Sequence, residues 1–265
     1  MKIVLISLSI LVFLFLPEIL SLSATEIDLP NGNQAPSLAH PFGQDLKGRD
    51  LFARVIHGTR LSLMIGLAAT LVSCTIGTLW GAVAGFRGGK VDTVMMRIVD
   101  VLFGLPFMFV VIILMAFVGR SILLLFLVLG LIHWLTMARV LRAEVTLIKN
   151  REFVQAARSL GCSTWRILSR HILPNISDTI IVYMTFTIPG VVLEEAFLSF
   201  LGLGVPAPEA SLGTLVREGI ITLSVHPWQL FFPAFFLLTI IFSVNWLSRR
   251  LQCRLAGQGI ATRNG

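Results

Sequence analysis

The sequence predicts an all-α integral membrane protein. Hydrophobic residues make up 55% of its 265 residues and charged residues only 13%, whereas a soluble domain carries about 25% charged residues. The mean hydropathy is +0.87. Several apolar runs approach the roughly 20 residues that a helix needs to cross a bilayer. Together, these observations indicate that most of the protein surface meets lipid rather than water.

Six segments qualify, or nearly qualify, as transmembrane helices. The first is the weakest candidate, because Pro17 and Glu18 shorten its apolar run. Lys2, followed by this run and then by small residues at 21–24, is also typical of a signal peptide, whose cleavage would leave five spans. We favour a retained helix, since the rest of the chain is itself embedded in the membrane. The predicted spans are residues 3–22, 61–84, 101–118, 121–138, 176–201 and 228–247.

Two prolines lie within these predicted spans. Pro106 follows Gly104, and Pro189 precedes Gly190. Because proline removes a helical hydrogen bond, each is expected to kink its helix. Such a kink can serve as a hinge or as an ordinary feature of membrane packing, and we favour the packing interpretation.

The distribution of Lys and Arg orients the spans. If the N-terminus is cytoplasmic, 15 of the 21 Lys and Arg residues lie on the cytoplasmic side and 6 on the other. Cytoplasmic loops carry the excess of basic residues, so we expect both termini in the cytoplasm. Residues 1–22 are then the first span, residues 23–59 an external loop, residues 60–250 the core and residues 251–265 a cytoplasmic tail. The longest cytoplasmic loop spans residues 139–171.

This cytoplasmic loop contains a short amphipathic helix. Phe153, Ala156, Ala157 and Leu160 recur at i, i+3, i+4 and i+7, which places them on one helix face. One interpretation is an interfacial helix on anionic lipid, with arginines at the headgroups. The other is docking against a soluble protein, since two small alanines bury little area in lipid but allow another surface to approach closely. The residues favour docking and leave both interpretations open.

Helix-ending and helix-starting residues divide the loop further. Gly161 follows the last apolar position, where a glycine commonly ends a helix. Ser163 is a candidate N-cap for a second short helix, which leads to Pro174 and the next span. The loop is therefore predicted to contain a helix, a glycine break and a second helix that returns to the membrane.

The same loop resembles the signature of ABC importer permeases, E-A-A-x-x-x-G followed by I-x-L-P. Here it reads Q-A-A-R-S-L-G from Gln155 to Gly161 and H-I-L-P from His171 to Pro174. Both alanines, the glycine and the L-P pair are in register, whereas Gln155 and His171 replace the family's Glu and Ile. The loss of the Glu removes an ion pair or cap that it would form, but it leaves the docking face.

Further stretches resemble the C-type subunit of the oligopeptide/dipeptide class, in order and spacing, over roughly residues 40–250. Leu212 departs from that class, which usually has Trp there; residues 248–250 replace a Gly-Asp-Gly-like stretch, and the usual A-L-D-P ending is absent. The matching stretches are H-P-F-G-Q-D from His40, G-R-D from Gly48, G-G-K-V-D from Gly88, R-H-I-L-P-N from Arg170 and L-S-F-L-G-L-G from Leu198.

The resemblance implies a type I ABC importer transmembrane fold and a place in the bacterial inner membrane, with the external loop in the periplasm. It implies one of two homologous permeases that form a peptide translocation path, with two ATP-binding subunits and a periplasmic or lipid-anchored peptide-binding protein as partners. ATP and Mg would be bound by the ATP-binding subunits, and this chain would need no cofactor. The loop would dock on an ATPase subunit as a coupling helix, through Phe153, Gln155, Ala156, Ala157, Leu160 and Gly161.

Two glutamates late in the fifth predicted span, Glu194 and Glu195, are candidates for the translocation path. A carboxylate at the bilayer centre costs about 2.5–3.5 kcal/mol on insertion scales, so each should face a cavity, a partner or the membrane boundary. Contact with the amino terminus of a peptide is one interpretation. A structural hydrogen bond to the partner permease is the other, and we favour it for Glu195. The resemblance includes the Glu195 position but not Glu194, which is therefore the better candidate for a substrate-specific contact.

The sequence contains no catalytic or metal-binding constellation. No Walker A motif is present, so ATP chemistry belongs to another chain. The three cysteines Cys74, Cys162 and Cys253 form no CxxC pair, so neither a disulfide framework nor a zinc site is supported. The net charge of +7 follows from basic loops and predicts no nucleic-acid partner. The alternatives left open are import of nickel, glutathione or cationic peptides by the same fold, a stand-alone secondary transporter or channel, and, third, a membrane-embedded enzyme.

Overall fold

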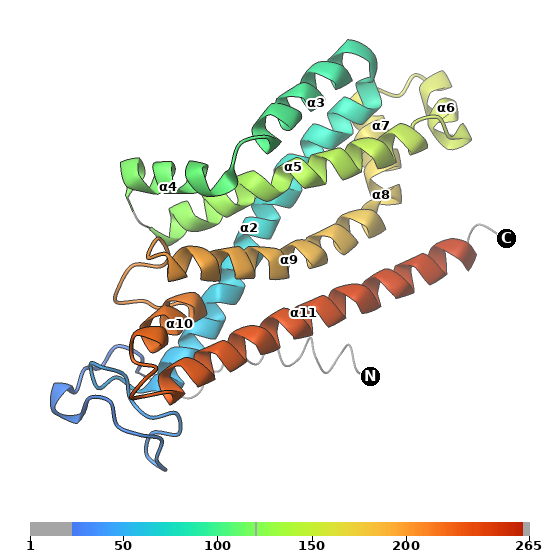
Figure 1. Ribbon diagram of the computed structural model, residues 1–265. Helices are drawn as coiled ribbons and strands as arrows, with labels where there is room; N and C mark the ends of the chain where they lie inside the picture. The colour runs from blue at the N-terminus through green and yellow to red at the C-terminus, as the bar shows by residue number, and fades with distance from the viewer. Residues whose placement is uncertain (1–22, 120, 262–265) are drawn as a thin grey trace.

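A computed structural model describes residues 23–119 and 121–261, which form helices joined by loops (Figure 1). Within these ranges, the one extended pairing is an isolated bridge between Gln44 and Asp50. The predicted all-α class is confirmed. In chain order the elements are η1 (Leu29–Asn31), α2 (Leu51–Arg87), α3 (Gly89–Phe103), α4 (Phe107–Val118), α5 (Ile122–Ile148), α6 (Glu152–Ser159), α7 (Thr164–Ile167), the π-helical segment η2 (Leu168–Ile172), α8 (Leu173–Asn175), α9 (Ser177–Phe200), α10 (Leu212–Ile221) and α11 (Trp228–Ala261).

Four helices in the described part of the chain are long and apolar enough to cross a membrane. They are α2, α5, α9 and the Trp228–Cys253 portion of α11. Each overlaps one of the predicted spans. Helix α2 begins before its predicted span, because the side chain of Asp50 accepts a hydrogen bond from the backbone of Ala53 and caps the helix at Leu51. The first predicted span, residues 3–22, lies outside the described residues.

The span predicted at residues 101–118, with a kink at Pro106, is not a single helix. Helix α3 ends at Phe103, Gly104 and Leu105 form a turn, and α4 begins after Pro106. Pro106 therefore separates two helices rather than kinking one. The 12 residues of α4 extend about 18 Å, which is less than the roughly 30 Å of a hydrocarbon core. Figure 1 shows α3 and α4 as separate rods that follow α5 on one side.

Pro189 has a different outcome, because α9 continues through it. A proline has no N–H to donate to the carbonyl four residues earlier, which here is that of Thr185. The hydroxyl of Ser248 in α11 donates to this carbonyl at 2.7 Å and also lies 2.8 Å from the carbonyl of Val244. A neighbouring helix thus satisfies the acceptor that the proline leaves free, as happens in membrane proteins.

Replacing Ser248 with alanine should lower the free energy of unfolding by about 1 kcal/mol, because the partly buried Thr185 carbonyl would lose its hydrogen bond. Unfolding of the purified protein in detergent would measure the change. Thr239→Ala is the matched control on the same helix, since the exposed Thr239 hydroxyl donates only to its own helix, at Phe235. Equal stability of both variants would contradict the proposed role of Ser248.

Helices α2 and α5 pack with their backbones in close contact. Gly77, Gly81 and Gly85 recur every fourth residue on the face of α2 that meets α5. A Cβ atom on Gly81 would lie 2.5 Å from the carbonyl oxygen of Ala138. Small residues at this spacing allow membrane helices to approach closely, so the glycines make α2 and α5 a rigid pair.

Two ion pairs attach α3 to this helix pair. Arg142 of α5 donates to Asp92, with its Nε at 2.9 Å from one carboxylate oxygen, and Arg139 donates to Asp100 at 2.9 Å. The Arg142 hydrogen bond lowers the pKa of Asp92. The carboxylate is therefore ionised at neutral pH, and the link between α3 and α5 is charged.

Candidate functional site

Helix α6 sits on the end of the α2–α5 pair. Its Val154 and Ala157 side chains are buried. They belong to one apolar cluster that includes residues of α2, α5 and the segment after α6, namely Ala82, Met137, Leu141, Val145, Ile167, Leu168, Ile172 and Ile176. The helix is therefore fixed to the membrane-spanning helices by packing rather than suspended on a loose loop.

The opposite side of α6 and the turn after it carry exposed apolar side chains. Phe153 is 41% exposed, Leu160 83% and Trp165 63%. We define the α6 surface as the exposed residues Phe153, Gln155, Ala156, Leu160, Gly161 and Trp165. The prediction that Ala157 shares this face is wrong, because its side chain packs inward. Val154, which holds the helix in place, and Trp165 were both missed.

The end of α6 confirms the predicted glycine break. Gly161 has a positive φ of 76°. The N–H of Cys162 donates to the carbonyl of Ala157, and the N–H of Gly161 donates to that of Arg158, which is the hydrogen-bond pattern of a glycine-terminated helix. The side chain of Ser163 then caps α7, accepting from the Arg166 N–H at 3.4 Å. These two ends give the chain the sharp turn that exposes Leu160.

Basic side chains surround the α6 surface. Arg151, Arg158, Arg166 and Arg170 are all exposed. The guanidinium of Arg158 lies 5.5 Å from the ring centre of Phe86 at the end of α2. An apolar centre with a charged margin is the usual composition of a protein interface.

Glu195 does not line a path in this structure. It is fully buried. One carboxylate oxygen accepts from Ser62 of α2 at 3.0 Å, and the other accepts from Ser199 at 2.6 Å. The Ser199 hydroxyl lies 3.1 Å from that of Ser211, the N-cap of α10. The translocation-path prediction for Glu195 is therefore corrected: its hydrogen bonds join α2, α9 and α10 within this chain.

Glu194 points to another side of α9. Its carboxylate lies 3.0 Å from the Nε2 atom of His133 in α5. Both residues line a cavity of about 490 Å³ between the α3–α4 junction, α5 and α9. His133 was not predicted as a site residue, because its partner is 61 positions away in the sequence. Among the described residues, no group of three or more His, Cys, Asp or Glu side chains could hold a metal ion.

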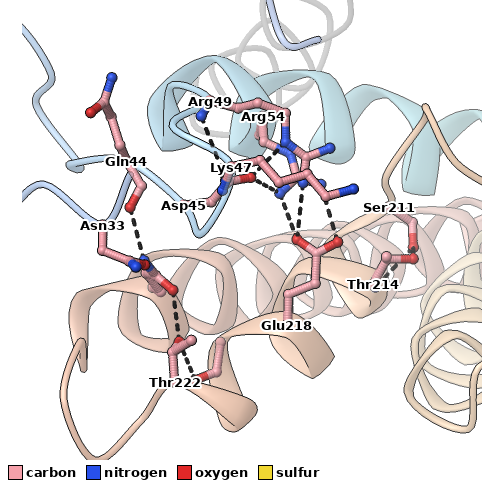
Figure 2. Close-up of polar contacts among 12 residues, drawn as sticks. Asn33, Gln44, Asp45, Lys47, Arg49, Arg54, Ser211, Thr214, Glu218 and Thr222 are labelled. Carbon is pink, nitrogen blue, oxygen red and sulfur yellow. Dashed lines mark hydrogen bonds and ion pairs between the residues drawn. The ribbon is translucent and has the colours of Figure 1, made fainter. Parts of the chain in front are cut away.

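A cluster of three buried charges and one partly exposed charge holds the segment before α2 against α10. Asp45 pairs with Arg49 at 2.7 Å and with Arg54 at 2.5 Å, and Arg54 also pairs with Glu218 at 2.5 Å. Figure 2 shows these four side chains gathered at one place. We call Asp45, Arg49, Arg54 and Glu218 the clamp. Its two positive and two negative groups balance one another, and they lie at the end of the molecule opposite α6 (Figure 1).

Two of the stretches that carried the resemblance have a physical role beside the clamp. His40 lies 2.7 Å from Asp50, the cap of α2. Phe42 stacks on Phe232 of α11, with ring centres 4.0 Å apart. The sequence contained these residues as a motif, but only the fold shows that they fix the ends of α2 and α11.

Comparisons with known proteins agree with the fold and the motifs. Residues 77–257 match the family described as "Binding-protein-dependent transport system inner membrane component". The oligopeptide transport system permease protein OppC of Bacillus subtilis is 42% identical over 91% of this chain and 79% of its own length. The dipeptide transport system permease protein DppC of the same organism is 43% identical, over 95% and 80%. OppC of Escherichia coli is 43% identical, over 92% and 82%.

Among solved structures, an inward-facing MetNI methionine ABC transporter contains a chain that superposes with a TM-score of 0.60 at 15% identity. The alignment covers 77% of this chain and 95% of that one. This similarity supports the fold alone and confirms the predicted importer architecture. The chain therefore belongs to the family of binding-protein-dependent transport system inner membrane components and is a membrane permease homologous to the oligopeptide and dipeptide transport permease proteins.

Proposed function

We propose that this chain forms half of a peptide translocation path in an ATP-driven importer of the bacterial inner membrane. Its relatives at 42–43% identity are named oligopeptide and dipeptide permeases, which supports peptide as the cargo. The partners are a second homologous permease, two ATP-binding subunits that bind ATP and Mg, and a peptide-binding protein. The excess of Lys and Arg supports a cytoplasmic position for α6 and for the end of α11, which lie at the same end of the molecule (Figure 1).

The observation that carries this proposal is the α6 surface. Large apolar side chains that are exposed in a continuous patch mark a contact with a partner. Phe153 of α6, Leu160 at its C-terminal cap and Trp165 of α7 are all exposed, whereas the other side of α6 is packed. Because the exposed Ala156 buries little area in lipid but allows another surface to approach closely, an ATP-binding subunit fits this surface better than anionic lipid does.

The packing of α6 explains how a partner could move the membrane-spanning helices. Val154 and Ala157 belong to one apolar cluster that joins α6, through α7 and η2, to the α2–α5 pair. Arg139 and Arg142 connect that pair to α3. A displacement of α6 would therefore be transmitted to three helices together. Rigid-body motion of packed helices is a common way to convert a local shift into alternating access.

Replacement of Leu160 by aspartate should lower the amount of ATP-binding subunit that co-purifies with the complex by about tenfold or more. Loss of a central interface side chain commonly weakens binding by 2 kcal/mol or more. ATP-dependent peptide uptake into proteoliposomes should fall in parallel. Because Leu160 is exposed, the thermal stability of the permease should stay within about 0.5 kcal/mol of wild type.

Leu38→Asp is the matched control. Leu38 is also fully exposed, but it lies in the segment before α2, at the other end of the molecule. This variant should retain the ATP-binding subunits. Normal association and uptake by the Leu160→Asp variant would overturn the docking role of the α6 surface. Uptake by the purified permease without ATP or partner subunits would instead indicate a stand-alone transporter.

A further inference from the structure

The cavity beside Glu194 is open on one side and is lined by three different helical segments. Phe103, Leu105 and Phe107 come from the α3–α4 junction, and Leu131 comes from α5. The polar side chains in the lining are those of His133, Thr136 and Glu194. Its volume of about 490 Å³ is within the range of ligand pockets, which are mostly apolar with a few polar groups. The break in the predicted span at Pro106 creates one wall of this cavity.

The side chain of Glu194 is partly accessible and lines this cavity. Its side chain is 30% exposed and that of His133 21%, although their atoms lie 3.0 Å apart. The neighbouring Glu195 shows how a purely structural carboxylate is accommodated in the same helix: it is fully buried between two serine hydroxyls. Ionisable groups inside a membrane protein are costly, and those that face a cavity mark functional sites.

We propose that Glu194, positioned by His133, is a transient binding site for the primary ammonium group of the transported peptide. The inference rests on the proposed function and specifies a contact within that path. The carboxylate supplies the opposite charge. The aromatic and aliphatic walls from Phe103 to Phe107 accommodate the apolar side chain next to the ammonium group.

The pairing with His133 makes such a contact reversible. When no peptide is present, the imidazole remains the partner of the carboxylate. An arriving ammonium group replaces it, so the carboxylate exchanges one hydrogen-bond donor for another and is never left without a partner. Because the ammonium group must displace this existing contact, the site would hold the cargo less tightly, as onward release through a membrane requires.

Glu194→Gln tests the charge with little change of shape. In the complete importer, reconstituted with its ATP-binding subunits and binding protein, uptake of a peptide with a free amino terminus should fall about tenfold, which corresponds to ~1.4 kcal/mol. Glu209→Gln is the matched control, because it removes the same charge from an exposed loop residue that does not line the cavity. It should change uptake less than twofold. Both variants should retain their ATP-binding subunits and melting temperature.

Chemical modification of Glu194 can be measured directly on the complex. The result then does not depend on which peptides the binding protein selects. Dicyclohexylcarbodiimide reacts with membrane-embedded carboxyl groups, and mass spectrometry locates the adduct. In the wild-type complex, a lysine-free peptide with a free amino terminus, or an N-acetylated peptide that contains lysine, should slow the modification of Glu194. The first result assigns the ammonium group to the peptide terminus and the second to a lysine side chain. An N-acetylated peptide without lysine should have no effect.

Equal protection by the peptide without an ammonium group would overturn the inference, as would unchanged uptake by the Glu194→Gln variant. Both results require a wild-type importer that transports peptide. They can therefore be distinguished from failure of the proposed function, in which the wild-type complex itself would not assemble or would not take up peptide in an ATP-dependent manner.

Discussion

Replacement of Asp45 by asparagine is expected to lower the free energy of unfolding by about 3 kcal/mol. Removing one partner of a buried ion pair costs about 3–5 kcal/mol, because a charge is left without compensation in the interior. Here the guanidinium groups of Arg49 and Arg54 would share Glu218 alone. The lower end of the range applies, since Glu218 remains in contact with Arg54.

Asparagine removes the charge of Asp45 but keeps the shape of its side chain. One carboxylate oxygen of Asp45 accepts hydrogen bonds from the backbone N–H groups of Lys47 and Arg49, at 2.8 Å and 3.0 Å. The amide oxygen of asparagine can accept the same bonds. Chemical unfolding of the purified protein would measure stability, and hydrogen exchange of residues 28–50 would locate the change. These amides should exchange faster, because the clamp holds their loop against α10.

Glu218→Gln is the matched control for Asp45→Asn. It removes the same charge from the same cluster, but the Glu218 side chain is 41% exposed, whereas that of Asp45 is buried. Exposed ion pairs contribute only about 0–1 kcal/mol, so this variant should lose less than 1 kcal/mol. Equal losses in the two variants would show that burial does not set the strength of the clamp. Wild-type stability of Asp45→Asn would show that the clamp is not stabilising.

The sequence predicted the long spans because their hydropathy depends on composition alone. The sequence could not predict whether each proline lies inside a helix or between two helices, because that depends on residues that are close only in the folded structure. Pro189 lies inside a continuous helix, since Ser248 of another helix donates to the Thr185 carbonyl. Pro106 lies between two helices. Both prolines stand in similar apolar runs, so hydropathy predicts a kink at each and distinguishes neither outcome.

The α6 surface shows a second limit of sequence reasoning. Helix α6 has only eight residues, and a pattern over so few positions fixes a helix but not which of its faces is buried. The spacing selected Phe153, Ala156, Ala157 and Leu160 as one face. The apolar cluster shared with α7, η2 and the α2–α5 pair instead buries Val154 and Ala157. The motif gave the location of the surface, and the fold determined which of its residues a partner can reach.

Adjacent residues on a helix face directions about 100° apart, so Glu194 and Glu195 could not share one environment. From the sequence, the two glutamates differ only because the family resemblance includes the Glu195 position and not Glu194. The structure separates them through their contacts: His133 on one side, and Ser62 and Ser199 on the other. The clamp was missed for a related reason, because its members at 45 and 218 are distant in the chain and no local pattern connects them.

Replacement of Gly81 by alanine should destabilise the protein by about 1–3 kcal/mol, the usual effect of inserting a methyl group into a packed interior. The added carbon would lie 2.5 Å from the Ala138 carbonyl oxygen and 2.9 Å from the Arg142 nitrogen. Both are backbone atoms, so no side chain can rotate away and α2 must move from α5. Leucine at this position should prevent native packing. Unfolding in detergent would measure both changes.

The same substitution at Gly190 is expected to have the opposite effect on stability. Gly190 also lies inside a membrane-spanning helix, but a Cβ there would meet only the His133 ring, at an ordinary 3.8 Å. Alanine is favoured over glycine in a helix interior by about 0.8–1.0 kcal/mol, so this variant should be as stable as wild type or more so. If Gly81→Ala lowers the stability and Gly190→Ala does not, the loss at Gly81 is caused by the α2–α5 contact. Destabilisation of both variants to the same extent would show that glycine flexibility, rather than close packing, is what these helices require.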